Sequence, residues 1–320
     1  MRIVFLGSPE FALPSLRALL ASEHEVAGVV TQPDRPAGRG RAPQPPAAKR
    51  LAGEHGLPVL QPERVNADES LAAIGALAPD ALVIAAYGQI LKQPLLDLPR
   101  RGALNVHASL LPRHRGASPV AAAILAGDDV TGVSILEVIL ALDAGPVLAT
   151  RELAIGTDDT TGSLSARLAE LGAALLIDVL PAWERGELTA APQDEALATY
   201  APVIAPVDAV IDWSLPATDV WRRVRAYHPW PVARTDAGGE TLRILEAWPL
   251  DGGPEVAPGT AIELPEDANV PEGAGFAVRC GDGLLAVVRA QRGGRRELTG
   301  AELLRGFRGL LGMRLGRGEG

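Results

Sequence analysis

The stretch Arg101-Gly-Ala-Leu-Asn-Val-His-Ala-Ser-Leu-Leu-Pro-Arg-His-Arg-Gly116 decides how this chain folds and where its chemistry lies. Residues Ala103–His107 within it predict a short strand, and the later proline cannot continue a sheet because it has no N–H to donate. Asn105 and His107 are two positions apart, so their side chains are expected on one face at the carboxyl end of the strand. The pattern places a neutral amide beside a titratable imidazole, and the loop Ser109–Pro112 follows next to both.

One acidic residue, Asp143, follows further along the chain in the segment Leu142-Asp-Ala-Gly145. Each of these polar residues also has an ordinary structural explanation. An asparagine or a histidine can satisfy nearby backbone groups, and an aspartate before Ala-Gly is a common turn residue. The residue types alone therefore leave a catalytic and a structural interpretation open.

The amino-terminal part of the chain predicts an open α/β sheet. Ile3–Leu6 is an apolar run, and the following Gly7-Ser-Pro-Glu10 predicts a turn into a helix, with Ser8 as the N-cap and a proline at the first helical position. Glu25–Thr31 predicts a second buried strand, which completes a βαβ unit. Ala81–Ala86 is wholly apolar, as is typical of a central strand in a parallel sheet. We expect a Rossmann-like, mostly parallel α/β domain.

The segment Tyr87-Gly-Gln-Ile-Leu91 follows the carboxyl end of that central strand, where open α/β sheets bind their ligands. A dinucleotide-binding dehydrogenase is the natural alternative for such a fold. The turn after the first strand, however, lacks the Gly-x-Gly-x-x-Gly pattern that lets backbone approach a pyrophosphate, and no acidic residue ends the second strand. The sequence therefore disfavours a dehydrogenase.

A cationic segment, Gln32–Pro46, carries Arg35, Arg39 and Arg41 among prolines and glycines. This composition predicts a long loop with neither helix nor strand. A solvated surface loop is the ordinary explanation. The chain has a formal net charge of -9, however, and a local arginine cluster in an acidic protein is typical of a segment that binds phosphates.

The length of 320 residues, of which 47% are apolar and 22% charged, indicates a soluble globular protein large enough for two domains. We expect a catalytic domain over residues 1–188, a linker over 189–206 and a second domain over 207–320. In the second domain the sequence predicts one helix, over Pro216–Tyr227, followed by short strands that Gly- and Pro-rich turns separate. Strands at such spacing predict a small antiparallel, OB-like β-barrel.

The opening apolar run is too short for a signal peptide core or a membrane span, so a cytoplasmic protein without membrane contact is expected. Cys280 is the only cysteine, which excludes an internal disulfide and a thiolate metal cluster. We expect Cys280 to be a small buried hydrophobe in a strand over Phe276–Cys280.

Several motifs together give the chain a family resemblance. They are Gly7-Ser-Pro-Glu-Phe-Ala12, Pro33-Asp-Arg-Pro-Ala-Gly-Arg-Gly40, Ala86-Tyr-Gly-Gln-Ile90, the central stretch with Leu142-Asp-Ala-Gly-Pro146, Ile211-Asp-Trp213 and His228-Pro-Trp-Pro231. The central motifs resemble in order and spacing the folate-dependent formyltransferases. The cationic loop and the barrel-like second domain are similar to those of the family members that act on tRNA. Two positions depart from that pattern, with Val203 where a lysine is usual and His228 where an asparagine is usual.

The resemblance implies a formyl transfer reaction that requires no metal. The donor would be 10-formyltetrahydrofolate as a co-substrate, and the acceptor the α-amino group of methionine carried by initiator tRNA, for translation initiation. Asn105 and His107 would donate to the oxyanion, while Asp143 would hold the imidazolium and help to remove the amine proton. We expect a monomer.

The same resemblance implies the binding residues. It assigns the folate pocket to two segments, which comprise Ser109, Leu110, Leu111 and Pro112, and Tyr87, Gly88, Gln89, Ile90 and Leu91. It assigns tRNA binding to Arg35, Arg39 and Arg41.

Two alternatives remain open. A formyltransferase that acts on a small nucleotide or sugar amine would share the central motif, and the cationic loop and barrel would then be incidental. A catalytically inactive RNA-binding relative is disfavoured by the joint presence of Asn105, His107 and Asp143. Formylation of charged initiator tRNA would distinguish these possibilities.

Overall fold

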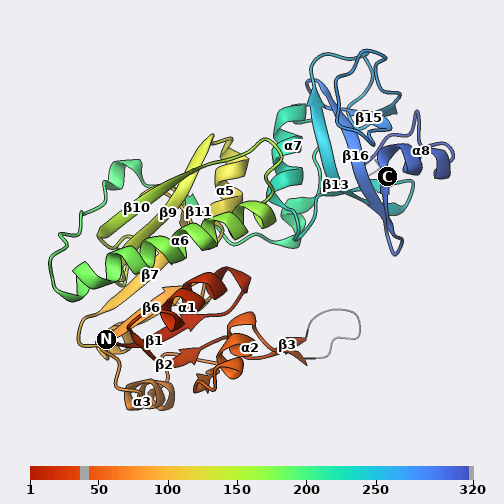
Figure 1. The fold of residues 1–320 in the computed structure, drawn as a ribbon. Coiled ribbons are helices and arrows are strands. Elements are labelled where there is room, and N and C mark those ends of the chain that lie inside the picture. Colours follow the sequence, from red (N-terminus) through yellow and green to blue (C-terminus); the bar gives the residue numbers. More distant parts are fainter. Residues whose placement is uncertain (37–42, 317–320) are drawn as a thin grey trace. The chain divides into compact units, whose positions relative to one another are not determined.

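A computed structural model describes residues 1–36 and 43–316 of the chain (Figure 1). Arg39 and Arg41, which the sequence assigned to tRNA binding, lie outside the described residues. The chain divides into two compact units. Unit 1 comprises residues 1–120, 129–155 and 163–202, and unit 2 comprises 121–128, 156–162 and 203–320.

The core of unit 1 is a seven-stranded sheet in the order β10-β9-β7-β6-β1-β2-β5. Its five strands from β5 to β7 are parallel, whereas β9 runs antiparallel to β7 and β10 antiparallel to β9. The expected open, mostly parallel sheet is confirmed. The strands are β1 (Arg2–Gly7), β2 (Glu25–Val30), β5 (Val59–Leu60), β6 (Ala81–Ala85), β7 (Ala103–His107), β9 (Val130–Glu137) and β10 (Val147–Ala154).

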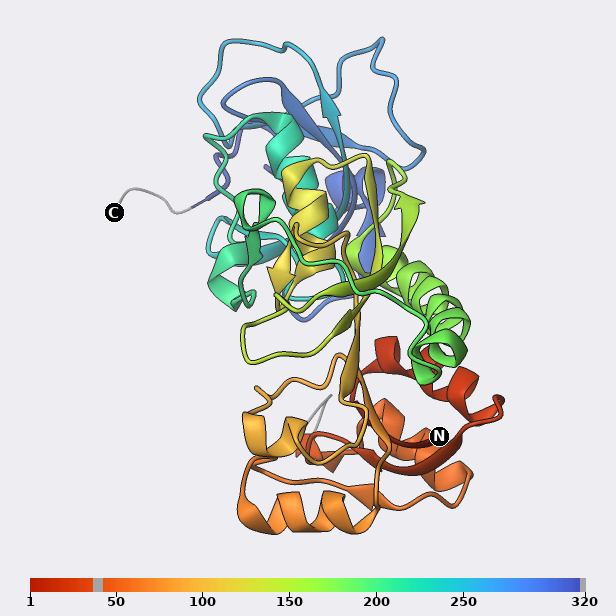
Figure 2. The same cartoon turned by 90° about the vertical axis from the view of Figure 1, so that its left-hand side faces the viewer.

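Helices cover both faces of this sheet (Figures 1 and 2). Ile74 of α3 and Leu95 of α4 pack with Val4 and Leu6 of β1 on one face. On the other face Gly172 of α6 lies directly against Val106, where an added Cβ would stand 2.7 Å from the valine Cγ1. The helices of this part of the chain are α1 (Leu13–Leu20), α2 (Ala47–Glu54), α3 (Asp68–Ala76), α4 (Gln93–Leu96) and α6 (Thr161–Glu184), with the short 3-10 helices η1 (Glu10–Ala12) and η2 (Glu195–Leu197).

Ser8 does not cap the first helix, so this expectation was wrong. The chain leaves β1 through η1, whose N-cap is Pro9. The Ser8 hydroxyl instead accepts a hydrogen bond of 2.9 Å from the N–H of Gln32 and donates one of 3.4 Å to the carbonyl of Tyr87. Ser8 therefore joins the segments that follow three neighbouring strands, β1, β2 and β6, at one edge of the sheet.

The cationic segment contains a short ladder, which corrects the prediction that it has no strand. Strand β3 (Arg35–Pro36) pairs antiparallel with β4 (Pro43–Gln44). A proline lacks the N–H group of a full ladder. Only about half of the N–H groups on a strand point toward any one partner, however, so a two-stranded ladder tolerates proline.

Residues between the two sequence-predicted domains also pair with unit 1. Strand β8 (Arg115–Gly116) runs parallel to β11 (Tyr200–Ala201), and Val147 and Ala191 form an isolated antiparallel bridge. Gly116 has a φ of +114°, and a Cβ added there would stand 2.6 Å from the carbonyl oxygen of Ala201. Only glycine allows this close approach.

Unit 2 contains a curled antiparallel sheet in the order β12-β13-β16-β15-β14, with β17 paired to β16. The expected antiparallel second domain is confirmed as a half-barrel. One apolar cluster fills it, including Val220, Ile244, Phe276 and the fully buried Cys280. The elements are α5 (Pro119–Ala126), η3 (Pro206–Ala209), α7 (Ala217–Ala226), β12 (Arg234–Ala237), β13 (Glu240–Leu250), β14 (Ala261–Ile262), β15 (Phe276–Arg279), β16 (Leu284–Arg292), β17 (Glu297–Thr299) and α8 (Gly300–Gly306). Among the described residues, no helix is both long and apolar enough to cross a membrane.

Candidate active site

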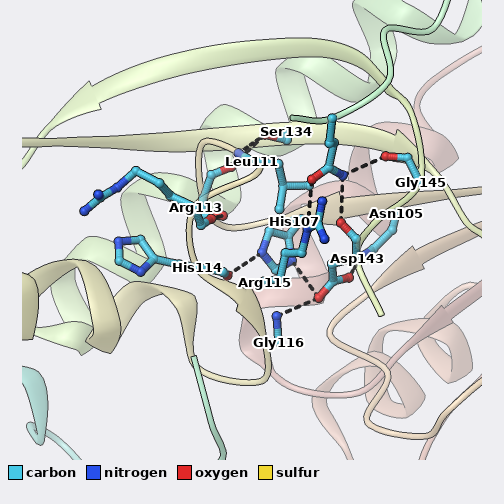
Figure 3. A network of polar contacts seen from close by, with 12 residues as sticks. Asn105, His107, Leu111, Arg113, His114, Arg115, Gly116, Ser134, Asp143 and Gly145 are labelled. Carbon is cyan, nitrogen blue, oxygen red and sulfur yellow. Dashed lines mark hydrogen bonds and ion pairs between the residues drawn. The ribbon is translucent and has the colours of Figure 1, made fainter. Parts of the chain in front are cut away.

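The three polar residues singled out in the sequence meet in unit 1 (Figure 3). Asn105 and His107 project from the same face of β7, and Asp143 comes from the loop after β9. The Asn105 Nδ2 donates a hydrogen bond of 3.2 Å to Asp143 Oδ1, and the His107 Nδ1 lies 3.6 Å from Asp143 Oδ2. The carboxylate therefore faces the amide with one oxygen and the imidazole with the other.

The Asp143 loop has an unusual backbone. Asp143 has a φ of +49°, in the left-handed region that residues other than glycine, asparagine and aspartate seldom adopt. Its Oδ2 accepts a 2.8 Å hydrogen bond from the N–H of Gly116. The side chain is only 12% exposed. Each carboxylate oxygen accepts one hydrogen bond, Oδ1 from Asn105 and Oδ2 from Gly116. The expectation that Asp143 lies in a turn is consistent with this geometry, and the turn directs its carboxylate inward.

His107 is buried, and each of its ring nitrogens faces an acceptor. Its Nε2 lies 3.0 Å from the carbonyl oxygen of His114, while Nδ1 faces Asp143. Only the imidazolium form can direct a hydrogen toward both acceptors. Nδ1 is the nitrogen on the side of Asn105 and Asp143.

The loop Ser109–Pro112 is held by hydroxyl groups. The Ser109 hydroxyl donates to the carbonyl of Arg113 at 2.6 Å, and the Ser134 hydroxyl donates to the Ser109 carbonyl at 2.7 Å. Ser134 also accepts the N–H of Leu111 at 3.1 Å. Because the Ser109 side chain is fully buried and bonded within the loop, it shapes the loop, and a ligand would contact other groups of this segment. The sequence reasoning did not identify Ser134.

The segment Tyr87–Leu91 follows β6, which is the neighbour of β7 in the sheet. Tyr87 is 2% exposed, and burial raises the pKa of its hydroxyl. The side chain of Gln89 holds the segment by accepting from the N–H of Val65 and donating to the carbonyl of Pro62. The side chain of Ile90, by contrast, is 78% exposed. The buried Tyr87 and the hydrogen-bonded Gln89 therefore fix the shape of the segment, and Ile90 presents an apolar surface.

Arg35 lies on β3, apart from the cluster of Asn105, His107 and Asp143. Its guanidinium forms an exposed ion pair of 2.8 Å with Glu63. The neighbouring Asp34 accepts from Lys49 and Gln61, and the Gln61 hydrogen bond lowers the pKa of Asp34 most strongly. No described contact links Arg35 to the three residues, so its proposed role in tRNA binding stays a prediction.

Two residues that the sequence reasoning missed support the Asp143 loop. The Gln193 Nε2 donates to the backbone carbonyls of Asp143 and Gly145, both at 2.7 Å. Its Oε1 accepts a 3.0 Å hydrogen bond from the Nε of Arg115, whose guanidinium is also paired with Glu195. This hydrogen bond to Glu195 raises the pKa of Arg115 and lowers that of the carboxyl. No local pattern predicts these contacts, because Arg115 and Gln193 are 78 residues apart.

Comparison with known proteins identifies the family. A profile of the formyl transferase family matches residues 1–180, and the profile of its C-terminal domain matches residues 203–308. The chain belongs to the formyl transferase family. The methionyl-tRNA formyltransferase of Methylococcus capsulatus is 49% identical over 316 residues, which cover 99% of this chain and all of the relative. Further relatives at 44–46% identity have the same name.

Solved structures show that this formyltransferase fold is shared with more distant proteins. HypX from Aquifex aeolicus in complex with tetrahydrofolic acid has a TM-score of 0.61 at 20% identity, over 97% of this chain and 48% of that protein. An N-formyltransferase from Helicobacter canadensis, in complex with folinic acid and dTDP-3-aminofucose, has a TM-score of 0.62 at 14% identity, over 90% of this chain and 99% of that protein. At these identities the likeness concerns the fold alone.

Proposed function

We propose that this formyltransferase transfers the formyl group of 10-formyltetrahydrofolate to the α-amino group of methionine on initiator tRNA. The observation that carries the proposal is the 49% identity to a methionyl-tRNA formyltransferase along the whole length of both chains. The cluster of Asn105, His107 and Asp143 supplies groups suited to the chemistry. The enzyme acts as a monomer in the cytoplasm, where translation initiates.

The donor is a folate, and the site fits such a molecule. A pterin ring has a hydrogen-bonding edge and flat apolar faces. The exposed Ile90 side chain offers an apolar contact beside the ends of β6 and β7. Among the described residues, the backbone N–H groups of Gln89, Ile90 and Leu91 have no hydrogen-bond partner and can donate to a ligand. We assign the segment Leu110–Pro112, which the buried Ser109 side chain helps to shape, to the same folate site.

Asn105 and His107 stabilise the oxyanion of the tetrahedral intermediate. The attack of an amine on the formyl carbon converts the carbonyl oxygen into an anion, which needs donors that are already in place. The Asn105 Nδ2 and the His107 Nδ1 both face the Asp143 carboxylate, so they converge on one place. The hydrogen bond from Nε2 to the His114 carbonyl fixes the ring, and Nδ1, which lies 3.6 Å from Asp143 Oδ2 and so beyond hydrogen-bond distance, can donate to the reacting oxygen.

Asp143 holds the imidazolium and accepts the proton that the amine loses. The new bond joins the methionine nitrogen to the formyl carbon and the bond to the folate nitrogen breaks. The departing folate nitrogen takes up one proton, and the amine loses one, which must reach a base. The Asp143 carboxylate is the acidic group in contact with both donors, and it removes this proton directly or through a water molecule.

The proposal is tested by formylation with matched acceptors. The purified protein is incubated with 10-formyltetrahydrofolate and with either methionyl initiator tRNA or a dTDP-amino sugar. We expect N-formylmethionine after deacylation of the tRNA and no formyl sugar, and we expect the same rate after treatment with EDTA. Formylation of the sugar alone would favour the alternative function, and failure with both acceptors would contradict the proposal.

A further inference from the structure

We propose that Gln193 is a positioning residue for formyl transfer, which holds the Asp143 loop in its left-handed conformation from the segment between the two family domains. This inference rests on the proposed function for its kinetic readout. It concerns a residue outside both matched family regions, 1–180 and 203–308.

The Asp143 loop needs an external support. A φ of +49° lies in the left-handed region that residues other than glycine seldom adopt, so the surroundings must fix it. The loop is also tight, since a Cβ added at Gly145 would stand 1.7 Å from the carbonyl oxygen of Glu137. Rotation of the Asp143 backbone would turn its carboxylate away from Asn105 and His107.

Gln193 bridges the two sides of this turn. Its amide nitrogen donates both hydrogens, one to the Asp143 carbonyl and one to the Gly145 carbonyl. The same aspartate is therefore held at its backbone by Gln193 and at its carboxylate by the N–H of Gly116. These two restraints together set the direction of the side chain.

Arg115 holds the Gln193 amide in the orientation that this bridge requires. An amide can rotate by half a turn, which would exchange its donor and acceptor ends. The Arg115 Nε donates to Oε1, so the nitrogen must point to the loop. Arg115 is 1% exposed, and its two Nη atoms are bonded to Glu195 at 2.8 and 2.9 Å. The guanidinium is thus fixed by a pair that does not involve the reacting groups.

The experiment compares Gln193→Glu and Gln193→Ala with wild type. The glutamate keeps an acceptor for Arg115 but places oxygen against both carbonyls, and the alanine removes the bridge. We expect kcat for methionyl-tRNA formylation to fall about 10- to 100-fold in both variants, as small displacements of catalytic groups do. KM for tRNA and Kd for folate should change less than about threefold. Gln291→Ala is the matched control, because Gln291 also bridges an arginine and a backbone carbonyl, in unit 2.

Two measurements distinguish positioning from a general loss of structure. In the background of Asp143→Asn, the Gln193→Glu substitution should lower kcat less than about threefold, because Gln193 acts through the carboxylate that is already absent. The ¹⁵N chemical shifts of the His107 ring should differ between wild type and Gln193→Ala, because the alanine removes the bridge to the Asp143 loop without adding a charge. This readout does not depend on the acceptor, so it remains valid if the proposed substrate is wrong. Full additivity in the double variant, or unchanged His107 ring shifts in Gln193→Ala, would overturn the inference.

Discussion

The side-chain amide of Asn105 donates to Asp143 Oδ1 across 38 residues of sequence, from the middle of β7 to the loop after β9. The sheet makes this contact possible, because Asn105 pairs in register with Ile84 of β6 on one side and Leu136 of β9 on the other. Asp143 therefore reaches the side chain of Asn105 from the loop that follows the adjacent strand β9. The geometry of the cluster depends on sheet register, and its chemistry depends on the charge of Asp143.

Asp143→Asn tests that charge. Asparagine tolerates a positive φ as well as aspartate does, so the turn should be preserved. The substitution loses the negative charge that faces His107 and the base that accepts the amine proton. We expect the single-turnover rate of formylation to fall by at least ~10²-fold, on the scale of general acid–base contributions. A variant as fast as wild type would mean that Asp143 is only a turn residue.

His107→Ala tests the oxyanion role. The imidazolium matters most where negative charge develops, so the chemical step should slow by at least ~10²-fold while Kd for folate changes by less than about threefold. The measurements are single-turnover formylation and a folate titration. His107→Gln serves as the comparison, because it retains an N–H donor for the His114 carbonyl that His107 contacts at 3.0 Å. Equal rates in wild type and both variants would exclude the assignment.

The sequence predicted the central strands β1 and β6 because each contains an uninterrupted apolar run. Every residue of β6 is buried, as the wholly apolar Ala81–Ala86 indicated. Short elements were not predictable in the same way. Strands β3 and β11 contain two residues each and exist only through their partners β4 and β8, which no local periodicity reports.

The candidate site was predictable only in part, for a similar reason. Asn105 and His107 share a face through simple strand alternation, and the family resemblance singled out Asp143. Ser8 was taken for a helix cap because its local context suits one, yet its hydroxyl bonds to Gln32 and Tyr87, which are distant in sequence. Gln193 likewise acts through carbonyl groups 48 and 50 residues away, so the signal lies in tertiary structure.

The free energy of unfolding of the protein should depend on pH through the thiol of Cys280. Burial raises the pKa of its thiol from 9.0 to about 12, so above pH 9 the unfolded chain loses this proton before the folded chain does. Its contribution to stability is therefore complete below pH 9 and is lost as pH rises toward 12. The free energy of unfolding should fall by about 1.4 kcal/mol per pH unit from this group.

The measurement is urea unfolding at pH 8 and pH 10 in a reducing buffer, for wild type and Cys280→Ala. The alanine variant should be less stable at pH 8 because it loses packing, and its stability should decline by about 1 kcal/mol less between the two pH values. Tyr87 and Tyr227, whose pKa values are also raised by burial, are present in both chains and cancel in the comparison. Parallel declines would show that the thiol does not titrate in this range.

The arginines of the cationic segment either contact tRNA or lie on a solvated loop. The acceptor is a polyanion whose amino acid must reach the site, and this segment follows β2, whose carboxyl end lies at the same sheet edge as the ends of β6 and β7. Replacing Arg39 and Arg41 by alanine should raise KM for tRNA and leave Kd for folate unchanged. The salt dependence should flatten by up to about one unit of slope per lost phosphate contact.

Arg35→Ala and Arg50→Ala form a matched pair for the same test. Each arginine makes an exposed ion pair of 2.8 Å in unit 1, Arg35 with Glu63 and Arg50 with Glu10, so loss of either pair should barely change stability. Only Arg35 belongs to the segment proposed to contact phosphates, and only Arg35→Ala should raise KM for tRNA and flatten its salt dependence. If Arg35→Ala and the double variant both keep wild-type tRNA kinetics across a salt series, the segment is a solvated loop, and tRNA must bind through other cations of the chain.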